Sequence, residues 1–537
     1  MLKARLAFPL SCSKIRAKRL VPPCCFTGFG SSAPGLSLGR IVGLLCLATL
    51  MFSCRSGRSS RAWELSHTDP RRYELAGDPH RPGYHFLPPA DWMDDANGVM
   101  EIDGIYHLFY QYTPGGAGRN TAPFHWGHAV SEDLLHWRDL DIALSPTDGG
   151  LDEQGCWSGS AVMNAGVPTL IYRARPAGAV IATSDDGLIT WNKKKTDMKG
   201  GDPHVWREND TWYCVMGAGS ESTGGLAHLF KSDDLLKWER VTTLVSGKTE
   251  ETGPFWELAQ LFEVGDKRVL TFCSHKDYTG YYISGSYRNH EFKPEVVDRL
   301  NYGGHFYAPY SFTDSRGRRI LIGWSWEGRT ERAYKNAGWA GVHTVPRVLS
   351  IRDDGRLGYE PIEELETLRD QHSHFESQPI NPRPEPRLLP DVQGDMLELI
   401  AEIDPGSADS VGLVVFASPD RREETRIVFD RKTATLSIDR SRASLDPTVH
   451  KTRYIAFAAD PVYGGSLDLA EGEPLRLRVY VDRSIVEVFA NGRLCLTDRV
   501  YPTLRESTGI GVFATGGGGA LKALDVWTLR PVWPIKR

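Results

Sequence analysis

The chain has 537 residues, a length that predicts about two to four domains. Its composition, 41% hydrophobic and 24% charged residues, is that of a globular protein, and its formal net charge of -5 excludes a generally basic nucleic-acid binder. The 15 Trp, 20 Tyr, 20 Phe and 54 Gly favour short strands joined by tight turns, and abundant aromatic side chains also suit a sugar-binding surface.

The first segment, residues 1–62, contains basic residues but no Asp or Glu. Its apolar run, Ile41–Ser53, is too short to span a bilayer and fits the hydrophobic part of a secretory signal. Cys54 follows at the position of the lipidated cysteine in a bacterial lipoprotein signal, although Met51 and Phe52 depart from that pattern. The segment therefore predicts an export leader, with a lipid anchor at Cys54 as an option. The expected location is periplasmic, extracellular or anchored to a bacterial membrane.

One phrase then recurs as SEDLLHW from Ser131, SDDGLITW from Ser184 and SDDLLKW from Ser232, with a weaker copy, SYRNHEF, from Ser286. Each phrase follows an alternating strand pair around a turn, and a fifth such pair, TDSRGRRILIGWSW, comes after the last phrase. The spacing of about fifty residues is the length of one four-stranded propeller blade. The repeat predicts a five-bladed β-propeller over residues 80–368, and a β-sandwich with coincidental similarity is the alternative.

Residues 369–390 include the Pro-rich stretch PINPRPEPRLLP, which predicts a stiff extended linker. Alternating strands resume beyond it without the repeated phrase, as in SVGLVVFAS and LRLRVYVDRSIVEVFANG. Asn491-Gly492 is a strong hairpin signal. Residues 391–537 are therefore predicted to form a β-sandwich, so that the chain is all-β, a five-bladed β-propeller followed by a C-terminal β-sandwich.

Three acids stand at the beginning of predicted blades, namely Asp95 in WMDDANG, Asp202 in KGGDPHVW and Glu257 in GPFWELAQLF. The innermost strands of a propeller converge at the mouth of its central channel, where ligands bind. A group of carboxylates there has to come from different blades, and these acids lie in different copies of the repeat. We expect the three side chains to meet.

At these residues the chain resembles glycoside hydrolase family 32, the invertases, levanases and inulinases that cleave β-fructofuranosides. WMDDANG is similar to the family's W-M-N-D-P-N-G, GDPHVW to its R-D-P segment and WELAQLF to its W-E-C-P-D-L-F segment. FHWGHAVSEDLLHW, WSGSAV, HFYAPYSF, GWAGVHTVPR and VDRSIVEVFANG follow the family's order. These matches run from about Tyr84 onward, and their order makes the resemblance specific. The family combines a five-bladed propeller with a sandwich, in agreement with the repeat.

The resemblance implies a retaining hydrolase with Asp95 as nucleophile, Glu257 as general acid/base and Asp202 as transition-state stabiliser. It implies no cofactor or metal ion and a fructose-containing oligo- or polysaccharide as substrate. Further substrate contacts are implied for Gln111, Trp157, Ser158 and Trp324. Packing is the competing interpretation for these four, most of all for Trp324. Preference among sucrose, levan and inulin, hydrolysis or transfer, and monomer or dimer are left open.

The chain departs from the family near the centre of the site. Asp94 replaces an Asn, Ala96 a Pro and Gly201 the Arg of R-D-P, while His305 replaces the Asp before the F-Y-A-P motif. Loss of the arginine removes a multi-donor contact to fructose hydroxyls. We expect Asp94 and His305 to contact the substrate instead, in an active hydrolase with altered furanoside preference.

Two other functions stay open from the sequence. One is a related furanosidase acting on arabinofuranosides, which the absent arginine favours. The other is a surface glycan-binding lipoprotein without turnover. The three acids disfavour that reading, because a pure binder gains nothing from carboxylates that are costly to desolvate.

Overall fold

The computed structural model describes residues 60–450 and 460–536. The predicted leader, including Cys54, therefore lies almost entirely outside the described residues. Within the described ranges, no helix is long and apolar enough to cross a membrane. The four cysteines present there, Cys156, Cys214, Cys273 and Cys495, are all buried free thiols.

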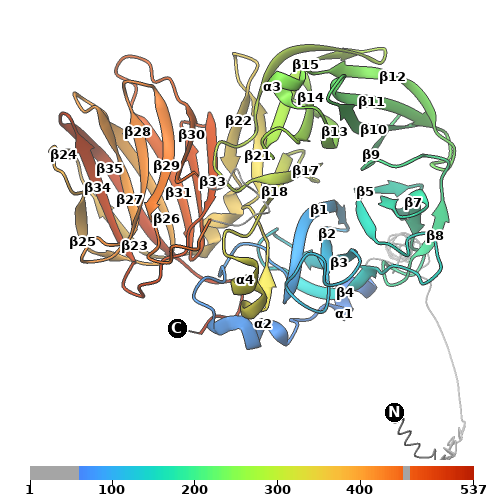
Figure 1. Cartoon of the computed structure of the whole chain (residues 1–537), viewed down its shortest axis with the longest axis horizontal. Helices are drawn as coiled ribbons and strands as arrows, with labels where there is room; N and C mark the ends of the chain where they lie inside the picture. Colours follow the sequence, from blue (N-terminus) through green and yellow to red (C-terminus); the bar gives the residue numbers. More distant parts are fainter. Residues whose placement is uncertain (1–59, 451–459, 537) are drawn as a thin grey trace, which may run out of the picture. The chain divides into compact units, whose positions relative to one another are not determined.

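Five antiparallel sheets, consecutive along the described chain, make up its first part (Figure 1). Their strands are β1 (Asp91–Ile102), β2 (Ile105–Thr113), β3 (His125–Ser131) and β4 (Arg138–Leu144); β5 (Cys156–Asn164), β6 (Val167–Ala174), β7 (Gly178–Thr183) and β8 (Asn192–Lys195); β9 (His204–Glu208), β10 (Thr211–Ser220), β11 (Gly224–Ser232) and β12 (Glu239–Ser246); β13 (Trp256–Val264), β14 (Lys267–Ser274), β15 (Gly280–Arg288) and β16 (Glu291–Arg299); and β17 (Tyr307–Thr313), β18 (Arg319–Ser325), β21 (Arg347–Ile351) and β22 (Leu357–Pro361). The short helices are α1 (Ser60–Leu65), α2 (Arg71–Glu74), η1 (Leu75–Gly77), α3 (Thr249–Thr252), α4 (Glu331–Ala337) and η2 (Glu363–Leu368).

The first strands of these sheets form a closed ring, since β1 contacts β5, β5 contacts β9, β9 contacts β13, β13 contacts β17 and β17 contacts β1. Two short strands tie the last sheet to the first: β19 (Trp339–Ala340) pairs in parallel with β1, and β20 (Val342–His343) pairs with β18. Gly341 lies between them with φ +89°, and a Cβ there would be 2.0 Å from the Met93 carbonyl oxygen. Only glycine permits this close approach. The arrangement is that of a β-propeller.

The repeated phrase forms the same tight turn after the third strand of three sheets. Its central leucines, Leu134, Leu188 and Leu235, are buried and have φ values of 66°, 66° and 63°. Asp133 and Asp234 accept backbone N–H groups two and three residues onward, which holds the turn. In the first and third copies the closing Trp donates to the Leu carbonyl at 2.9 and 3.0 Å. The phrase therefore encodes a tight turn that these three sheets repeat.

The remaining strands form a sandwich of two sheets. One contains β23 (Arg369–Phe375), β24 (Gln378–Ile380), β35 (Gly519–Leu529), β26 (Met396–Asp404), β31 (Leu475–Asp482), β32 (Ile485–Ala490) and β33 (Leu494–Arg499). The other contains β25 (Arg387–Gln393), β34 (Gly509–Thr515), β27 (Ser410–Ala417), β28 (Glu424–Asp430), β29 (Thr435–Arg442) and β30 (Val462–Ser466). A core of Leu, Ile and Val side chains fills the space between them. The predicted fold class, a propeller followed by a sandwich, is confirmed.

The prediction of an extended linker over residues 369–390 is wrong. This stretch contains β23 and β24, which pair with β35, and the start of β25, which pairs with β34. β23 and β25 lie at the edges of the two sheets. Edge strands tolerate proline because a missing N–H there breaks no ladder bond, so a Pro-rich sequence does not exclude a strand.

Buried acids of the sandwich are satisfied by groups of the propeller. Glu487 on β32 contacts Arg347 at 2.5 Å and His85 at 3.1 Å, and it accepts the Val345 N–H at 2.6 Å. Asp482 contacts the other nitrogen of His85 at 2.8 Å. All four side chains involved are at most 1% exposed. A buried ion pair broken on one side is costly, so these contacts couple the two folds.

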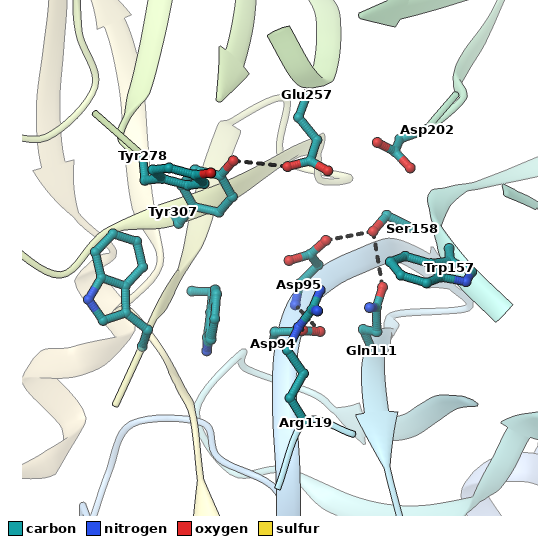
Figure 2. Close-up of a pocket in the computed structure, with 12 residues that line it drawn as sticks. Asp94, Asp95, Gln111, Arg119, Trp157, Ser158, Asp202, Glu257, Tyr278 and Tyr307 are labelled. Carbon is teal, nitrogen blue, oxygen red and sulfur yellow. Dashed lines mark hydrogen bonds and ion pairs between the residues drawn. The ribbon is translucent and has the colours of Figure 1, made fainter. Parts of the chain in front are cut away.

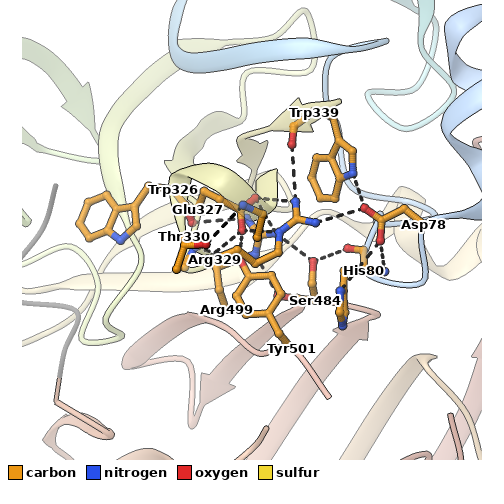
Figure 3. A network of polar contacts seen from close by, with 12 residues as sticks. Asp78, His80, Trp326, Glu327, Arg329, Thr330, Trp339, Ser484, Arg499 and Tyr501 are labelled. Carbon is orange, nitrogen blue, oxygen red and sulfur yellow. Dashed lines mark hydrogen bonds and ion pairs between the residues drawn. The ribbon is translucent and has the colours of Figure 1, made fainter. Parts of the chain in front are cut away.

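A second network, shown in Figure 3, connects the sandwich to the segment that follows β18. Glu327 contacts Arg329 at 2.9 Å and also accepts the Tyr501 hydroxyl. Arg329 reaches Asp78 at 3.2 Å. Arg499 on β33 donates to the backbone carbonyls of Ser325 and Trp326 at 3.4 and 3.3 Å. The sandwich thus holds the backbone at the end of β18.

Candidate active site

Four of the five first strands contain a β-bulge where candidate residues lie. The register shifts fall at Asp94–Asp95 in β1, Trp157–Ser158 in β5, Leu258–Ala259 in β13 and Ala308–Pro309 in β17. Leu258 and Ala308 have positive φ values of 55° and 45°. A bulge redirects a side chain out of the regular alternation and is common next to active sites. Asp94, Asp95, Trp157 and Ser158 at the bulges of β1 and β5 line one pocket, and Glu257 and Tyr307, directly before the other two bulges, line it as well.

The predicted catalytic acids line one pocket with a cavity volume of about 190 Å³ (Figure 2). They come from three sheets: Asp95 from β1, Glu257 from β13 and Asp202 from the loop before β9. The predicted contact residues Asp94, Gln111, Trp157, Ser158 and Trp324 also line this pocket. In the described part of the chain, no cluster of His, Cys, Asp or Glu has the arrangement of a metal site.

Asp95 is held by Ser158, whose hydroxyl donates to Asp95 Oδ2 and lies 2.5 Å from it. The same hydroxyl lies 3.0 Å from Gln111 Oε1, so the three residues form a short polar chain (Figure 2). Burial raises the pKa of Asp95 well above its ordinary value, and the charges of Asp94, Glu257 and Asp202 act in the same direction. The Ser158 hydrogen bond opposes this rise and favours the ionised form.

Glu257 Oε2 is 2.9 Å from the Tyr307 hydroxyl, which donates to it, and 3.2 Å from His275 Nε2. Burial alone would raise the pKa of Glu257, but the contacts from His275 and Tyr307 outweigh it and leave the pKa below its ordinary value. The hydrogen bond to Glu257 raises the pKa of His275 against the effect of burial. Glu257 and His275 therefore titrate as a pair.

Asp202 faces Arg173 of β6, with Asp202 Oδ1 3.7 Å from a guanidinium nitrogen. Burial and the nearby Glu257 raise the pKa of Asp202 to about 7, although Arg173 acts in the opposite direction. Gly201 has φ +81°, and a Cβ there would lie 2.6 Å from the Met216 sulfur. An arginine at 201 would therefore strain the backbone and displace Met216. In this chain the cation beside Asp202 comes from Arg173.

Asp94 is buried beside Arg119, whose Nε lies 3.7 Å from Asp94 Oδ2. Asp94 Oδ1 accepts the Asp95 backbone N–H at 3.0 Å, and the Trp92 indole donates to Oδ2 at 3.4 Å. Burial raises the pKa of Asp94, and Arg119 counters that rise. The acid at this position is thus paired with a cation in the same pocket.

The structure corrects the prediction made for His305. It is fully buried, does not line the pocket, and places Nδ1 2.6 Å from Asp498 of the sandwich. His305 lies in a bend before β17, outside the regular alternation of the strand, so its direction is not tied to that of Tyr307 two residues further on. His305 points to the sandwich, whereas Tyr307 faces the pocket. The expectation that His305 contacts the substrate is therefore wrong.

Several pocket residues were not anticipated from the sequence. Tyr278, Tyr307 and Trp326 line the pocket together with Arg119, while His275 and Arg173 contact its acids. Arg119, Arg173 and Arg175 all lie over the Trp157 ring, at 5.9, 5.5 and 4.3 Å from its centroid. The FYAP motif could have indicated Tyr307. The arginines lie at the end of β6 and in loops, where the sequence contains no motif that would indicate them.

Comparisons with known proteins show which family the chain resembles. Models of the "Glycosyl hydrolases family 32 N-terminal domain" and "Glycosyl hydrolases family 32 C terminal" match residues 85–361 and 364–528. The chain is similar to a sucrose-6-phosphate hydrolase of Escherichia coli, with 32% identity over 85% of this chain and 96% of the relative. A levanase of Bacillus subtilis is 30% identical over 92% of this chain and 75% of the relative. Among solved structures, fructan 1-exohydrolase IIa from Cichorium intybus has a TM-score of 0.75 at 26% identity, covering 85% of this chain and 98% of that one.

Proposed function

The chain belongs to glycoside hydrolase family 32, and from that premise we propose that it is a retaining enzyme that releases terminal fructose from fructans or sucrose. It is a glycoside hydrolase of the β-fructofuranosidase type. The observation that carries the proposal is the meeting of Asp95, Asp202 and Glu257, from three sheets, in one pocket. The family also favours a fructofuranoside over an arabinofuranoside as substrate.

In the first step Asp95, as the carboxylate, attacks the anomeric carbon while Glu257 gives a proton to the glycosidic oxygen. The bond to the leaving sugar breaks, and fructose stays on Asp95 as an ester. In the second step Glu257, now a carboxylate, takes a proton from water, and the resulting hydroxide attacks the same carbon. Fructose leaves and Asp95 is restored as a carboxylate.

Other pocket groups support this sequence of steps. Ser158 favours the ionised form of Asp95 and fixes its orientation toward the pocket. Asp202, backed by Arg173, is placed to accept hydrogen bonds from ring hydroxyls that tighten as positive charge develops on the sugar. Trp157, Trp324 and Trp326 supply apolar walls for the sugar.

We propose that cleavage occurs at chain ends. A cavity of about 190 Å³ is smaller than the ~300–1,000 Å³ typical of drug-sized ligands, and so suits one monosaccharide ring. Chromatography of products from levan and inulin tests this: free fructose should be the first product. Early release of longer oligosaccharides would contradict terminal cleavage.

The test of the function itself is hydrolysis of sucrose, levan, inulin and an aryl arabinofuranoside by protein that begins near Ser56. Fructose release that is lost in both Asp95→Asn and Glu257→Ala is the expected result. The relatives named above act on sucrose 6-phosphate and levan, so both disaccharide and polymer belong in the assay. Arabinose release, or sugar binding without turnover, would overturn the proposal.

We further propose that the apolar run Ile41–Ser53 directs export and that Cys54 is an anchor site in a bacterium. Expression of the full chain in a bacterial host, followed by fractionation, tests the first part. Membrane association that is lost in Cys54→Ala supports the anchor. Retention of all the protein inside the cell contradicts export.

A further inference from the structure

His275 is the side chain that contacts the proposed acid/base from outside the pocket lining. It follows β14, and its Nε2 lies 3.2 Å from Glu257 Oε2. The backbone N–H of His275 donates to the Phe255 carbonyl at 3.1 Å. Its ring is stacked with Tyr278, with centroids 5.5 Å apart, and lies against Phe255 at 5.0 Å. Backbone and rings together fix the imidazole against Glu257.

The groups around Glu257 and His275 act in opposite directions on the proton that the pair holds. The titratable or charged groups that act on Glu257 or His275 are Asp94, Asp95, Asp202, Arg173, Cys273 and Tyr307. Three of them are carboxyl groups, whose negative charge favours a proton within the pair. The Tyr307 hydroxyl and Arg173 favour the Glu257 carboxylate instead. An imidazole in direct contact with Glu257 gives that proton a second place to reside.

We propose that His275 is a positioning residue that stores the proton which Glu257 delivers to the glycosidic oxygen. The inference rests on the proposed function. Before substrate binds, the pair is an imidazolium and a carboxylate. The proton moves from His275 Nε2 to Glu257 Oε2, which leaves a neutral imidazole and a carboxylic acid. Glu257 gives that proton to the leaving oxygen, later takes one from water, and returns it to Nε2.

Storage of this kind has a consequence for the pH profile. The pair loses its last proton at the raised pKa of His275, so activity should persist to higher pH than Glu257 alone would permit. His275→Gln keeps a hydrogen-bond donor but cannot hold the proton. Its alkaline limb of kcat/KM should then move to lower pH by about one unit, since the limb reports Glu257 alone.

The experiment measures kcat/KM on sucrose from pH 4 to 9 for the wild type, His275→Gln and His290→Gln. His290 is a matched control, because its Nε2 also makes a polar side-chain contact, to the Tyr213 hydroxyl at 2.9 Å, and it does not line the pocket. We expect His275→Gln to lose severalfold, up to about tenfold, at pH 7 and at most about threefold at pH 5. The control should follow the wild type throughout. An equal loss at every pH would mean a structural role only and would overturn the proposal.

A second substrate separates this inference from the proposed function. β-Fructofuranosyl fluoride has a leaving group that needs no strong acid, so the first step on it should be unaffected in His275→Gln. A wild type inactive on both substrates would overturn the proposed function. A wild type that needs Glu257 but has the same alkaline limb as His275→Gln would overturn only the role of His275.

Discussion

Charge pairs surround the reacting acids at the scale of single residues: Asp202 with Arg173 at 3.7 Å, and Asp94 with Arg119 at 3.7 Å. Both arginines come from outside the motifs that carry the acids. Arg173→Met removes the cation that lowers the pKa of Asp202, so Asp202 should be protonated over more of the neutral range. We expect kcat/KM at pH 7 to fall about tenfold or more, measured on sucrose. Arg207→Met, which removes a surface pair with Asp210, should have no effect; equal losses in both would contradict this role.

Asp202 also affects stability. Its folded pKa of about 7 lies above the ordinary value of 3.8, so between these values the folded protein binds more protons than the unfolded chain. Stability from this group is therefore present at low pH and is lost as pH rises toward 7. Asp202→Asn avoids the loss and should stabilise the protein at pH 8 by on the order of 2 kcal/mol, with little change at pH 4. Urea denaturation at the two pH values measures this, and an equal effect at both would contradict it.

At the scale of elements, the end of β18 forms a wall of the pocket through Trp324 and Trp326. The sandwich holds that wall, because Arg499 donates to the Ser325 and Trp326 carbonyls. Arg499→Lys keeps the charge but cannot make this set of bonds. We expect KM to rise several-fold, with a loss of about 1–3 kcal/mol in unfolding free energy. An unchanged KM despite lower stability would show that the sandwich does not position this wall of the pocket.

The turns and strands also show how much of the fold and of the site could be predicted from the sequence. The repeat arises from local turn chemistry at Leu134 and its equivalents, and such local signals can be read along the chain. The bulges at Asp94–Asp95 and Leu258–Ala259 left no such signal, because they depend on pairing between strands. His275 reaches Glu257 from the end of the paired strand of the same sheet, and Arg173 reaches Asp202 from another sheet, so only the folded chain brings them together. His305 was misplaced because its position beside a motif did not reveal which way its side chain points.

At the scale of the whole molecule, the propeller and sandwich share buried charges. Arg347 and His85 of the propeller depend on Glu487, and all three are at most 1% exposed. A chain that ends at residue 368 would leave these groups without their partner, at a cost of about 3–5 kcal/mol for a broken buried pair. We expect residues 57–368 alone to be protease-sensitive and inactive, as limited proteolysis and sucrose assays would measure. A folded, active propeller would contradict this dependence.

In the proposed reaction Asp95, and not its neighbour Asp94, attacks the sugar. The most direct measurement is peptide mass spectrometry of Glu257→Ala after reaction with β-fructofuranosyl fluoride. The fluoride permits the first step without the acid, and loss of the base slows the second, so an ester should accumulate. We predict one fructosyl group on Asp95, absent when Asp95→Asn is added to the same protein. A label on Asp94, or free fructose with no label under conditions of turnover, would contradict the account.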